Sequence, residues 1–157
     1  MTDCMGRFLL PRNPVDSLDV YLAADGGKAL GKALNMPPER VIAEIKKSGL
    51  RGRGGAGFPT GAKWASVAHD PCPTKYVVCN GAEGEPGTFK DRMLLRKNPY
   101  QILEGIAIAA YSVNAKKAFL CIKKSFEKET ISVRKALSEM SAGGYLGPTP
   151  IELVLGP

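Results

Sequence analysis

The sequence predicts an α/β fold with a parallel sheet of three to four strands, preceded by short helices and incomplete at its C-terminus. Three short apolar runs, at residues 76–79, 117–122 and 151–155, have the length and composition of strands. The first run lacks the alternation of a half-exposed strand, which favours burial on both faces and therefore parallel pairing. Segments with helical periodicity separate the runs, and crossovers of this length favour right-handed connections.

Short helices are predicted before the sheet. Residues 1–14 contain prolines and no periodicity, so we expect an extended arm there. Asp16 or Ser17 is placed to cap a short helix, because both side chains can accept a hydrogen bond from a free backbone amide. A second short helix is expected at residues 28–34.

The clearest helix of the first third begins at residues 37–39 and ends at Gly49. Its start combines prolines with a glutamate near the positive end of the helix, and glycine is the usual residue just after a C-cap. Thr60 is then expected to cap a further helix. These boundaries divide the chain into an N-terminal arm with helices, residues 1–48, and an α/β domain, residues 49–157.

Three more helical stretches are predicted between the strands. Thr88 is expected to cap the first, which runs to about Lys97, and an apolar face at residues 102–110 marks the second. The third is an amphipathic helix at residues 125–140. Its inward residues are expected to be Ile131, Val133, Leu137 and Met140. The third strand then runs almost to Pro157, so we expect the sheet unit to continue in a longer chain or a partner polypeptide.

The most informative segment is Ser48–Trp64, whose six glycines leave long runs of backbone without a Cβ atom. Arg51, Arg53 and Lys63 are interleaved with these glycines, so backbone amides and cationic side chains can converge on one anion. This combination favours a phosphate or cofactor cradle. A purely structural glycine loop and an RNA-binding element remain as alternatives.

The segment matches no common nucleotide fingerprint in its usual form. Lys63 is followed by Trp64 and not by the hydroxyl residue that a P-loop places on magnesium. Gly52, Gly54 and Gly57 fit the spacing of a dinucleotide-binding turn, but a predicted helix precedes them where that motif requires a strand.

A second glycine-rich turn follows the first predicted strand and carries Asn80, Glu83 and Glu85. Ligands of open α/β sheets bind outside the carboxyl ends of the strands, so these three are candidate site residues. A solvated turn is the alternative for the two glutamates. Residues 90–92, a lysine, an aspartate and an arginine, are expected to form a structural ion-pair cluster at a helix start.

Composition narrows the class of protein without identifying it. The formal net charge of +7 suits an anionic ligand, a nucleic acid or an acidic partner, and aromatic residues (7%) are too sparse for a single-strand stacking platform. The four scattered cysteines and single histidine offer no metal-ligand spacing, so no metal site is predicted. No apolar run approaches the roughly 20 residues of a membrane span, and we expect a cytoplasmic protein without membrane insertion.

Together, the segments Ser48–Trp64 and Cys79–Arg92 resemble the flavin-binding NADH dehydrogenase subunit of respiratory complex I. Related subunits of NAD-linked hydrogenases and formate dehydrogenases are similar too. The resemblance implies a Rossmann-like sheet that binds FMN, hydride transfer from NADH to FMN, and electrons passed to iron–sulfur centres elsewhere. It also implies other redox subunits of a multisubunit complex as partners, a position peripheral to the membrane through them, and any [4Fe–4S] cluster outside this chain.

The resemblance further implies roles for individual residues. FMN would be held by Gly52, Arg53, Gly54, Gly55, Lys63, Asn80 and Glu83. NADH would be held by Phe58, packing on its adenine, and by Glu85, orienting its nicotinamide end. No catalytic residue is implied, because hydride transfer is the chemistry of the cofactor. A loop anchor in the core is the alternative for Phe58.

The chain also departs from the pattern of this family. Gly81 and Ala82 stand where alanine and aspartate are usual, and Ser66 replaces a second adenine-packing phenylalanine. The later flavin contacts and the cluster cysteines of the family lie beyond Leu155. Two functions are therefore expected: an NADH-oxidising module that is active with its C-terminal part or partner subunits, or a non-catalytic assembly or split-subunit partner with the same fold. RNA binding is a third.

Overall fold

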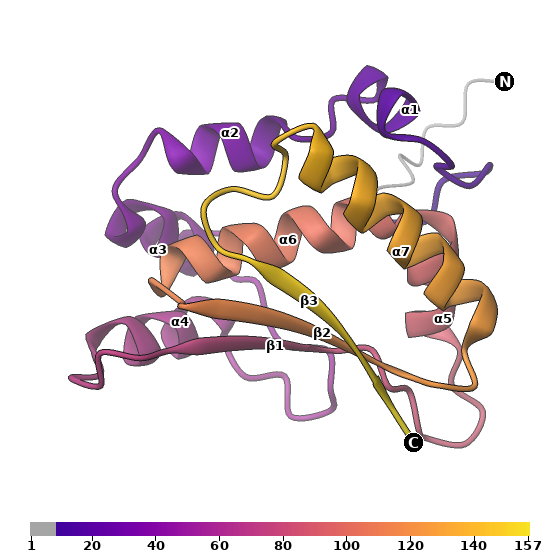
Figure 1. Ribbon diagram of the computed structural model, residues 1–157. Coiled ribbons are helices and arrows are strands. Elements are labelled where there is room, and N and C mark those ends of the chain that lie inside the picture. Colours follow the sequence, from indigo (N-terminus) through magenta and orange to yellow (C-terminus); the bar gives the residue numbers. More distant parts are fainter. Residues whose placement is uncertain (1–8) are drawn as a thin grey trace, which may run out of the picture.

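The computed structural model describes residues 9–157. Its centre is a parallel sheet in which β1 (Tyr76–Asn80), β2 (Lys117–Lys123) and β3 (Ile151–Gly156) lie in sequence order (Figure 1). The predicted α/β class and the parallel pairing are confirmed. Most of the arm expected at the N-terminus, residues 1–8 with Cys4, lies outside the described residues.

The described part of the chain contains helices before and between the strands. They are α1 (Leu18–Ala23), α2 (Lys28–Leu34), α3 (Pro38–Lys47), α4 (Thr60–His69), α5 (Lys90–Lys97), α6 (Pro99–Ser112) and α7 (Glu127–Ala142). The crossover from β1 to β2 contains α5 and α6, and the crossover from β2 to β3 contains α7. Figure 1 shows α6 and α7 on the same side of the sheet. Two right-handed crossovers that advance in one direction place their helices on one face, so this arrangement follows from the strand order.

Two of the predicted helix signals act as expected. The Ser17 hydroxyl accepts a hydrogen bond from the Val20 amide at 3.3 Å, so Ser17 and not Asp16 caps α1. Gly49 follows α3 with a φ of 68°, a left-handed conformation that glycine adopts without a steric penalty.

Two other cap predictions are wrong. Thr60 is the first residue of α4 and Pro59 occupies its N-cap position, where no side chain caps the helix. Thr88 lies outside α5, and its hydroxyl donates a hydrogen bond to the Glu85 carbonyl at 2.7 Å. Phe89 occupies the N-cap position of α5, so Thr88 lies one residue too early to cap the helix.

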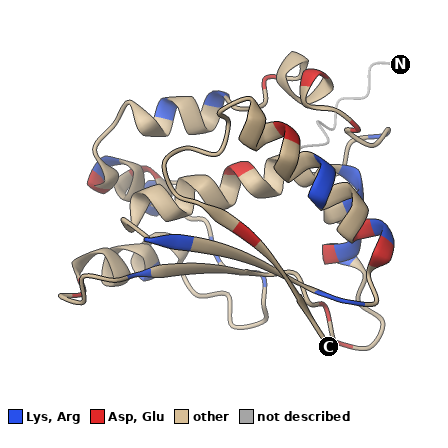
Figure 2. Cartoon of the chain, viewed as in Figure 1, with Lys and Arg blue, Asp and Glu red and all other residues tan. Residues whose placement is uncertain are grey.

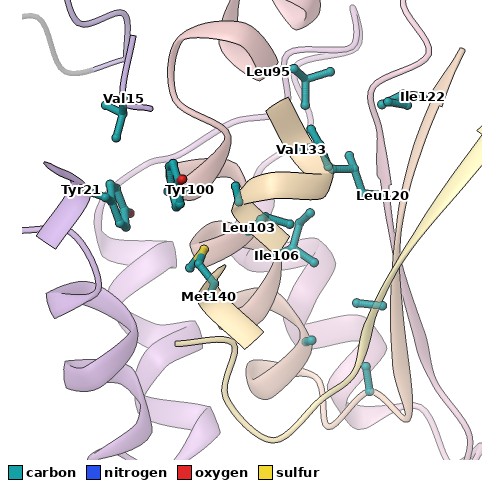
Figure 3. Packing of buried hydrophobic residues seen from close by; sticks show 14 of the residues in the cluster. Val15, Tyr21, Leu95, Tyr100, Leu103, Ile106, Leu120, Ile122, Val133 and Met140 are labelled. Carbon is teal, nitrogen blue, oxygen red and sulfur yellow. The ribbon is translucent and has the colours of Figure 1, made fainter. Parts of the chain in front are cut away.

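The hydrophobic core lies between β2 and helices α6 and α7 (Figure 3). Every second residue of β2 is buried, at 0–1% exposure for Ala118, Leu120 and Ile122. Val133 and Met140 of α7 are buried as predicted, but Ile131 is 70% exposed, so its expected inward position is wrong. The helix rotates about 100° per residue, and a face defined by Val133 and Met140 leaves Ile131 on the opposite side.

The other face of the sheet is open. Tyr76 and Val78 of β1 are 54% and 61% exposed, and Phe119 of β2 lies beside Val78 in register. The burial on both faces that the apolar run of β1 predicted is therefore not found within the described residues. The cause is topological, because the helices of both crossovers cover the same face. No helix of the described chain is long and apolar enough to cross a membrane.

Candidate functional site

The carboxyl ends of the parallel strands form one edge of the sheet, and β1 ends there at Asn80. Its side-chain oxygen accepts a hydrogen bond from the Ala82 amide at 3.0 Å, which fixes the first residues of the following turn. The Gly81 amide donates to the Cys121 carbonyl at 2.7 Å and extends the pairing with β2. A Cβ atom on Gly81 would lie 3.0 Å from an Ile122 methyl, so glycine lets the chain approach β2 without displacing that methyl group.

Glu83 caps helix α5 from the preceding turn. Its side chain is only 3% exposed, and its Oε1 accepts a hydrogen bond from the Asp91 amide at 3.2 Å. Its Oε2 lies 3.5 Å from the Nε of Arg92, and neither of these two buried atoms has a hydrogen-bond partner within the described chain. Although desolvation opposes it, backbone hydrogen bonds from Asp91 and Arg92, with nearby positive charge, lower the pKa of Glu83.

The ion-pair cluster expected at residues 90–92 is confirmed. Lys90 contacts Asp91 at 2.7 Å on the surface, and Arg92 pairs with Glu83. The Arg92 guanidinium also lies 5.4 Å from the ring centre of Phe126, which precedes α7. These contacts hold the turn against the start of α5.

Glu85 stands in the same turn but is used differently. Its backbone carbonyl accepts hydrogen bonds from the amide and the hydroxyl of Thr88, and the residue itself is exposed. Gly87 closes the turn with a φ of 78°. The solvated-turn alternative therefore describes Glu85 in this structure, whereas the buried carboxylate of Glu83 does not fit it.

The glycine segment forms a closed loop between α3 and α4. The Gly52 amide donates to the Phe58 carbonyl and the Thr60 amide to the Leu50 carbonyl, both at 2.9 Å. Between these bonds, Gly55 and Gly57 adopt φ values of 110° and 60°, which strain any residue with a Cβ atom. The loop is therefore held at its base by backbone hydrogen bonds while its tip is exposed.

Three cations surround this loop without a carboxylate partner in the described chain: Arg51, Arg53 and Lys63. The Lys63 ammonium lies 6.0 Å from the ring centre of Phe58. Phe58 is 53% exposed, so the alternative in which it anchors the loop in the core is wrong. An exposed aromatic ring beside free cations can bind a planar, negatively charged ligand.

Both motifs are tied to β1. Trp64 of α4 packs against the core cluster and lines an apolar cavity of about 420 Å³ with Val77 and Cys79 of β1, which places the glycine-loop helix beside that strand. The carboxylate turn follows β1 directly. Within the described chain no hydrogen bond or ion pair joins the loop at 49–61 to the turn at 80–92, so each is positioned separately through β1.

One glycine of the motif has a structural role that the sequence did not reveal. A Cβ atom on Gly61 would lie 2.6 Å from the backbone nitrogen of Lys46, so the residue allows α4 to cross α3 at close range. Cys79, also beside the site, is half-buried, and burial followed by the nearby charge of Asp91 raises the pKa of its thiol to about 11. Cys79 is therefore a neutral packing residue at physiological pH.

Residues 45–157, more than half of the chain, match the model of the Nuo51 FMN-binding domain. The chain belongs to this family. It is 46% identical to an NADH-quinone oxidoreductase subunit of Aquifex aeolicus over 133 residues, which are 85% of this chain and 31% of that protein. It is 39% identical to a subunit of the NADP-reducing hydrogenase of Solidesulfovibrio fructosivorans, over 84% of this chain and 27% of that one.

A solved structure gives the same result for the fold. A chain of the air-oxidized NAD⁺-reducing [NiFe]-hydrogenase superposes with a TM-score of 0.74 at 32% identity, covering 91% of this chain and 25% of the other. The chain thus spans about a third or less of the length of its Nuo51-family relatives. The complex I resemblance of the two sequence motifs is confirmed at the level of the family.

The residues of this chain fit the cofactor in the name of the Nuo51 family. A phosphate group needs cations and exposed amides, and the glycine loop offers Arg51 and Arg53 beside backbone that no neighbouring atom covers at Gly54 and Gly55. A polar heterocycle needs amide and carboxylate partners. Asn80 is exposed at the sheet edge, and Glu83 retains an oxygen without a hydrogen bond, which is buried beside Arg92 in the described chain.

Sequence reasoning did not single out Lys123, although a signal for it existed. Lys123 is the last residue of β2, as Asn80 is the last residue of β1, and strand ends are where ligands bind in open sheets. Glycine spacing and residue type located the loop and the turn, and the family resemblance singled out Phe58. The signal for Lys123 is its position at a strand end alone, with no glycine motif around it.

Proposed function

We propose that this chain forms the FMN- and NADH-binding part of an NADH-oxidising oxidoreductase subunit. The observation that carries the proposal is that two groups of candidate ligand-binding residues are both positioned next to β1. The glycine loop, with three cations lacking carboxylate partners in the described chain, is attached to β1 through α4, and the Asn80 turn follows the carboxyl end of β1. Membership of the Nuo51 family and the names of its relatives support the same ligands.

Most of the proposed contacts use a group that the structure leaves exposed, and Glu83 is the exception. Gly54 and Gly55 expose backbone at which a phosphate can approach, and Arg53 and Lys63 supply positive charge. Gly52 is exposed beside them, with its amide bonded to the Phe58 carbonyl. The Asn80 amide and the Glu83 carboxylate lie at the sheet edge, where they would bind the flavin ring or its ribityl chain. Glu83 would do so through its Oε2, since its Oε1 accepts from the Asp91 amide. This oxygen is buried beside the Arg92 Nε, so it would have to turn toward the ligand.

The substrate would bind next to the flavin. Phe58 presents an exposed ring for the adenine of NADH, and Glu85 an exposed carboxylate for its nicotinamide end. FMN, when bound, accepts a hydride from NADH, and the protein supplies placement and electrostatics. Electrons would then leave to iron–sulfur centres outside this chain, in its C-terminal part and in partner redox subunits. The complex would be cytoplasmic and peripheral to the membrane.

The decisive experiment uses the full-length native gene product with any subunits that co-purify. We expect a flavin absorption spectrum, release of FMN on denaturation, and NADH-dependent reduction of an artificial acceptor. A preparation that binds FMN but does not reduce the acceptor supports the alternative, a non-catalytic assembly or split-subunit partner. A preparation that stays colourless with excess FMN and the complementary segment contradicts both cofactor binding and the enzymatic function.

A further inference from the structure

Lys123 stands at the same sheet edge as Asn80. It is the last residue of β2. Ala118, Leu120 and Ile122 point into the core, and Lys123 is an odd number of residues from each of them, so its side chain lies on the opposite, open face of the sheet. Cys121, two residues earlier, pairs in register with Asn80. The end of β2 therefore places Lys123 beside the first residues of the carboxylate turn.

The ammonium of Lys123 reaches over this turn. Its Nζ lies 3.7 Å from the position that a Cβ atom on Gly84 would take, between Glu83 and Glu85 in sequence. Yet neither glutamate pairs with it. The Glu83 carboxylate is directed to Asp91 and Arg92, and the described chain shows no ion pair from Lys123 to Glu85.

Lys117, at the other end of β2, is a lysine on the same face that has interaction partners within the protein. Its ammonium pairs with Glu152 of β3 at 3.0 Å and lies 5.7 Å from the ring centre of Phe119. Lys117 and Lys123 share the strand and the face, and Figure 2 shows basic residues at both ends of β2. Only the lysine at the amino end has a protein partner within the described chain.

A half-buried lysine without a counter-charge does not stabilise the folded protein. Its desolvation cost is offset by no ion pair, and its side chain gives up rotamer freedom to lie against the turn. The same arrangement is favourable when an anionic ligand occupies the edge, because the cation is already in place and little ordering is needed on binding.

We propose that Lys123 is a further cofactor-binding residue of this site, whose ammonium binds an anionic oxygen of the bound flavin nucleotide. This inference rests on the proposed function. Two parts of the cofactor carry such oxygens: the phosphate, in every redox state, and the ring, which gains negative charge on reduction. Asn80 and Lys123 would then hold the ligand from adjacent strands, β1 and β2.

The test compares Lys123→Ala and Lys123→Arg with the wild type in the full-length native protein. Lys117→Ala is the matched control, because it removes the same charge from the same strand and face at about 20 Å distance, beyond the screening length at physiological salt. The dissociation constants of FMN and riboflavin are measured by fluorescence in oxidised and reduced states, with the midpoint potential of the bound flavin and the melting temperature of the cofactor-free protein.

We expect Lys123→Ala to weaken FMN binding by about tenfold to a hundredfold, the effect of losing one charge-assisted hydrogen bond, with Lys123→Arg close to wild type. A loss seen with FMN but not riboflavin assigns the contact to the phosphate. A loss with both ligands, confined to the reduced state and joined to a lower midpoint potential, assigns it to the ring.

Other outcomes overturn the inference. If Lys123→Ala and Lys117→Ala give the same cofactor affinities and potentials, Lys123 has no special contact. If Lys123→Ala lowers the melting temperature but leaves every affinity unchanged, the residue only stabilises the turn. A wild-type protein that binds FMN and oxidises NADH while Lys123→Ala behaves identically removes this inference alone, whereas a wild type that binds neither cofactor removes the proposed function together with it.

Discussion

The glycine loop, which reaches β1 through α4, and the carboxylate turn, which follows β1, use their charged side chains in opposite ways. In the turn, the carboxylate of Glu83 is 3% exposed and engaged with the start of α5. In the loop, Arg53 and its neighbouring cations are exposed and have no carboxylate partner in the described chain. The turn therefore contributes to folding before any ligand arrives, whereas the charges of the loop are available for a ligand. Two segments that are both rich in glycine and charged residues thus have different physical roles.

This difference separates stability from binding in the expected mutational effects. Changes that touch the fixed part of either motif should lower the free energy of unfolding. Changes at the exposed part should leave it unchanged and reduce cofactor affinity instead.

The largest effect on stability is expected at Gly61. A methyl group there would overlap the backbone of Lys46, and relief requires α3 and α4 to move apart. Gly61→Ala should lower the free energy of unfolding by about 3 kcal/mol, measured by urea denaturation. Gly54→Ala, in the same loop, is the matched control, because nothing lies within 4 Å of its added methyl group, and its stability should stay within about 0.5 kcal/mol of wild type. Equal losses in both variants would show that the loop is uniformly tight.

A smaller loss is expected from Glu83→Gln. The change removes the charge that faces Arg92 and weakens the cap of α5, so the free energy of unfolding should fall by about 2 kcal/mol. Lys90→Ala serves as the control, since it breaks the surface pair with Asp91 and leaves the contacts of Glu83 with Asp91 and Arg92 in place. It should cost less than about 1 kcal/mol. A Glu83→Gln variant as stable as wild type would mean that the turn, like the loop, leaves its charge free for ligands.

Replacing Arg53 is expected to lower cofactor affinity and to leave stability unchanged. Arg53→Ala should leave the melting temperature of the cofactor-free protein unchanged and raise the dissociation constant of FMN about tenfold, because one charge-assisted contact is lost. Arg40→Ala removes an equal charge from the exposed surface of α3 and should alter neither quantity. Loss of FMN affinity by the same factor in both variants would point to the overall positive charge of the protein and not to the loop.

The parts of this structure that could be predicted from sequence are those decided locally. The three strands were found because an apolar run bounded by turn residues is a local property, and Ser17 and Gly49 act within one helical turn of where they stand. The open face of β1 could not be predicted, because it depends on the side to which both crossovers turn.

In the candidate site, too, local features could be predicted and contacts between distant segments could not. Glycine spacing and residue type located the loop and the turn, and the family match supports that assignment. They did not show that Glu83 replaces Thr88 as the cap of α5, since this depends on how the turn folds back on the helix. Nor could they show that Lys123 reaches Gly84, a contact between segments distant in sequence.

The smallest expected effect concerns pH and distinguishes the two regions most finely. The pKa of Glu83 is lowered in the folded protein, so its stabilisation is fully present above the pKa of an unfolded glutamate, about 4.3, and is lost as the pH falls through the folded value. The stability difference between wild type and Glu83→Gln should therefore shrink between about pH 5 and pH 3 in urea titrations. The difference between wild type and Arg53→Ala should stay near zero throughout this range, because Arg53 has no carboxylate partner in the described chain. If the stability of wild type and of Glu83→Gln changed with pH in parallel, Glu83 would contribute through its shape and hydrogen bonding alone. The contrast between the structural turn and the available loop would then depend on packing rather than on charge.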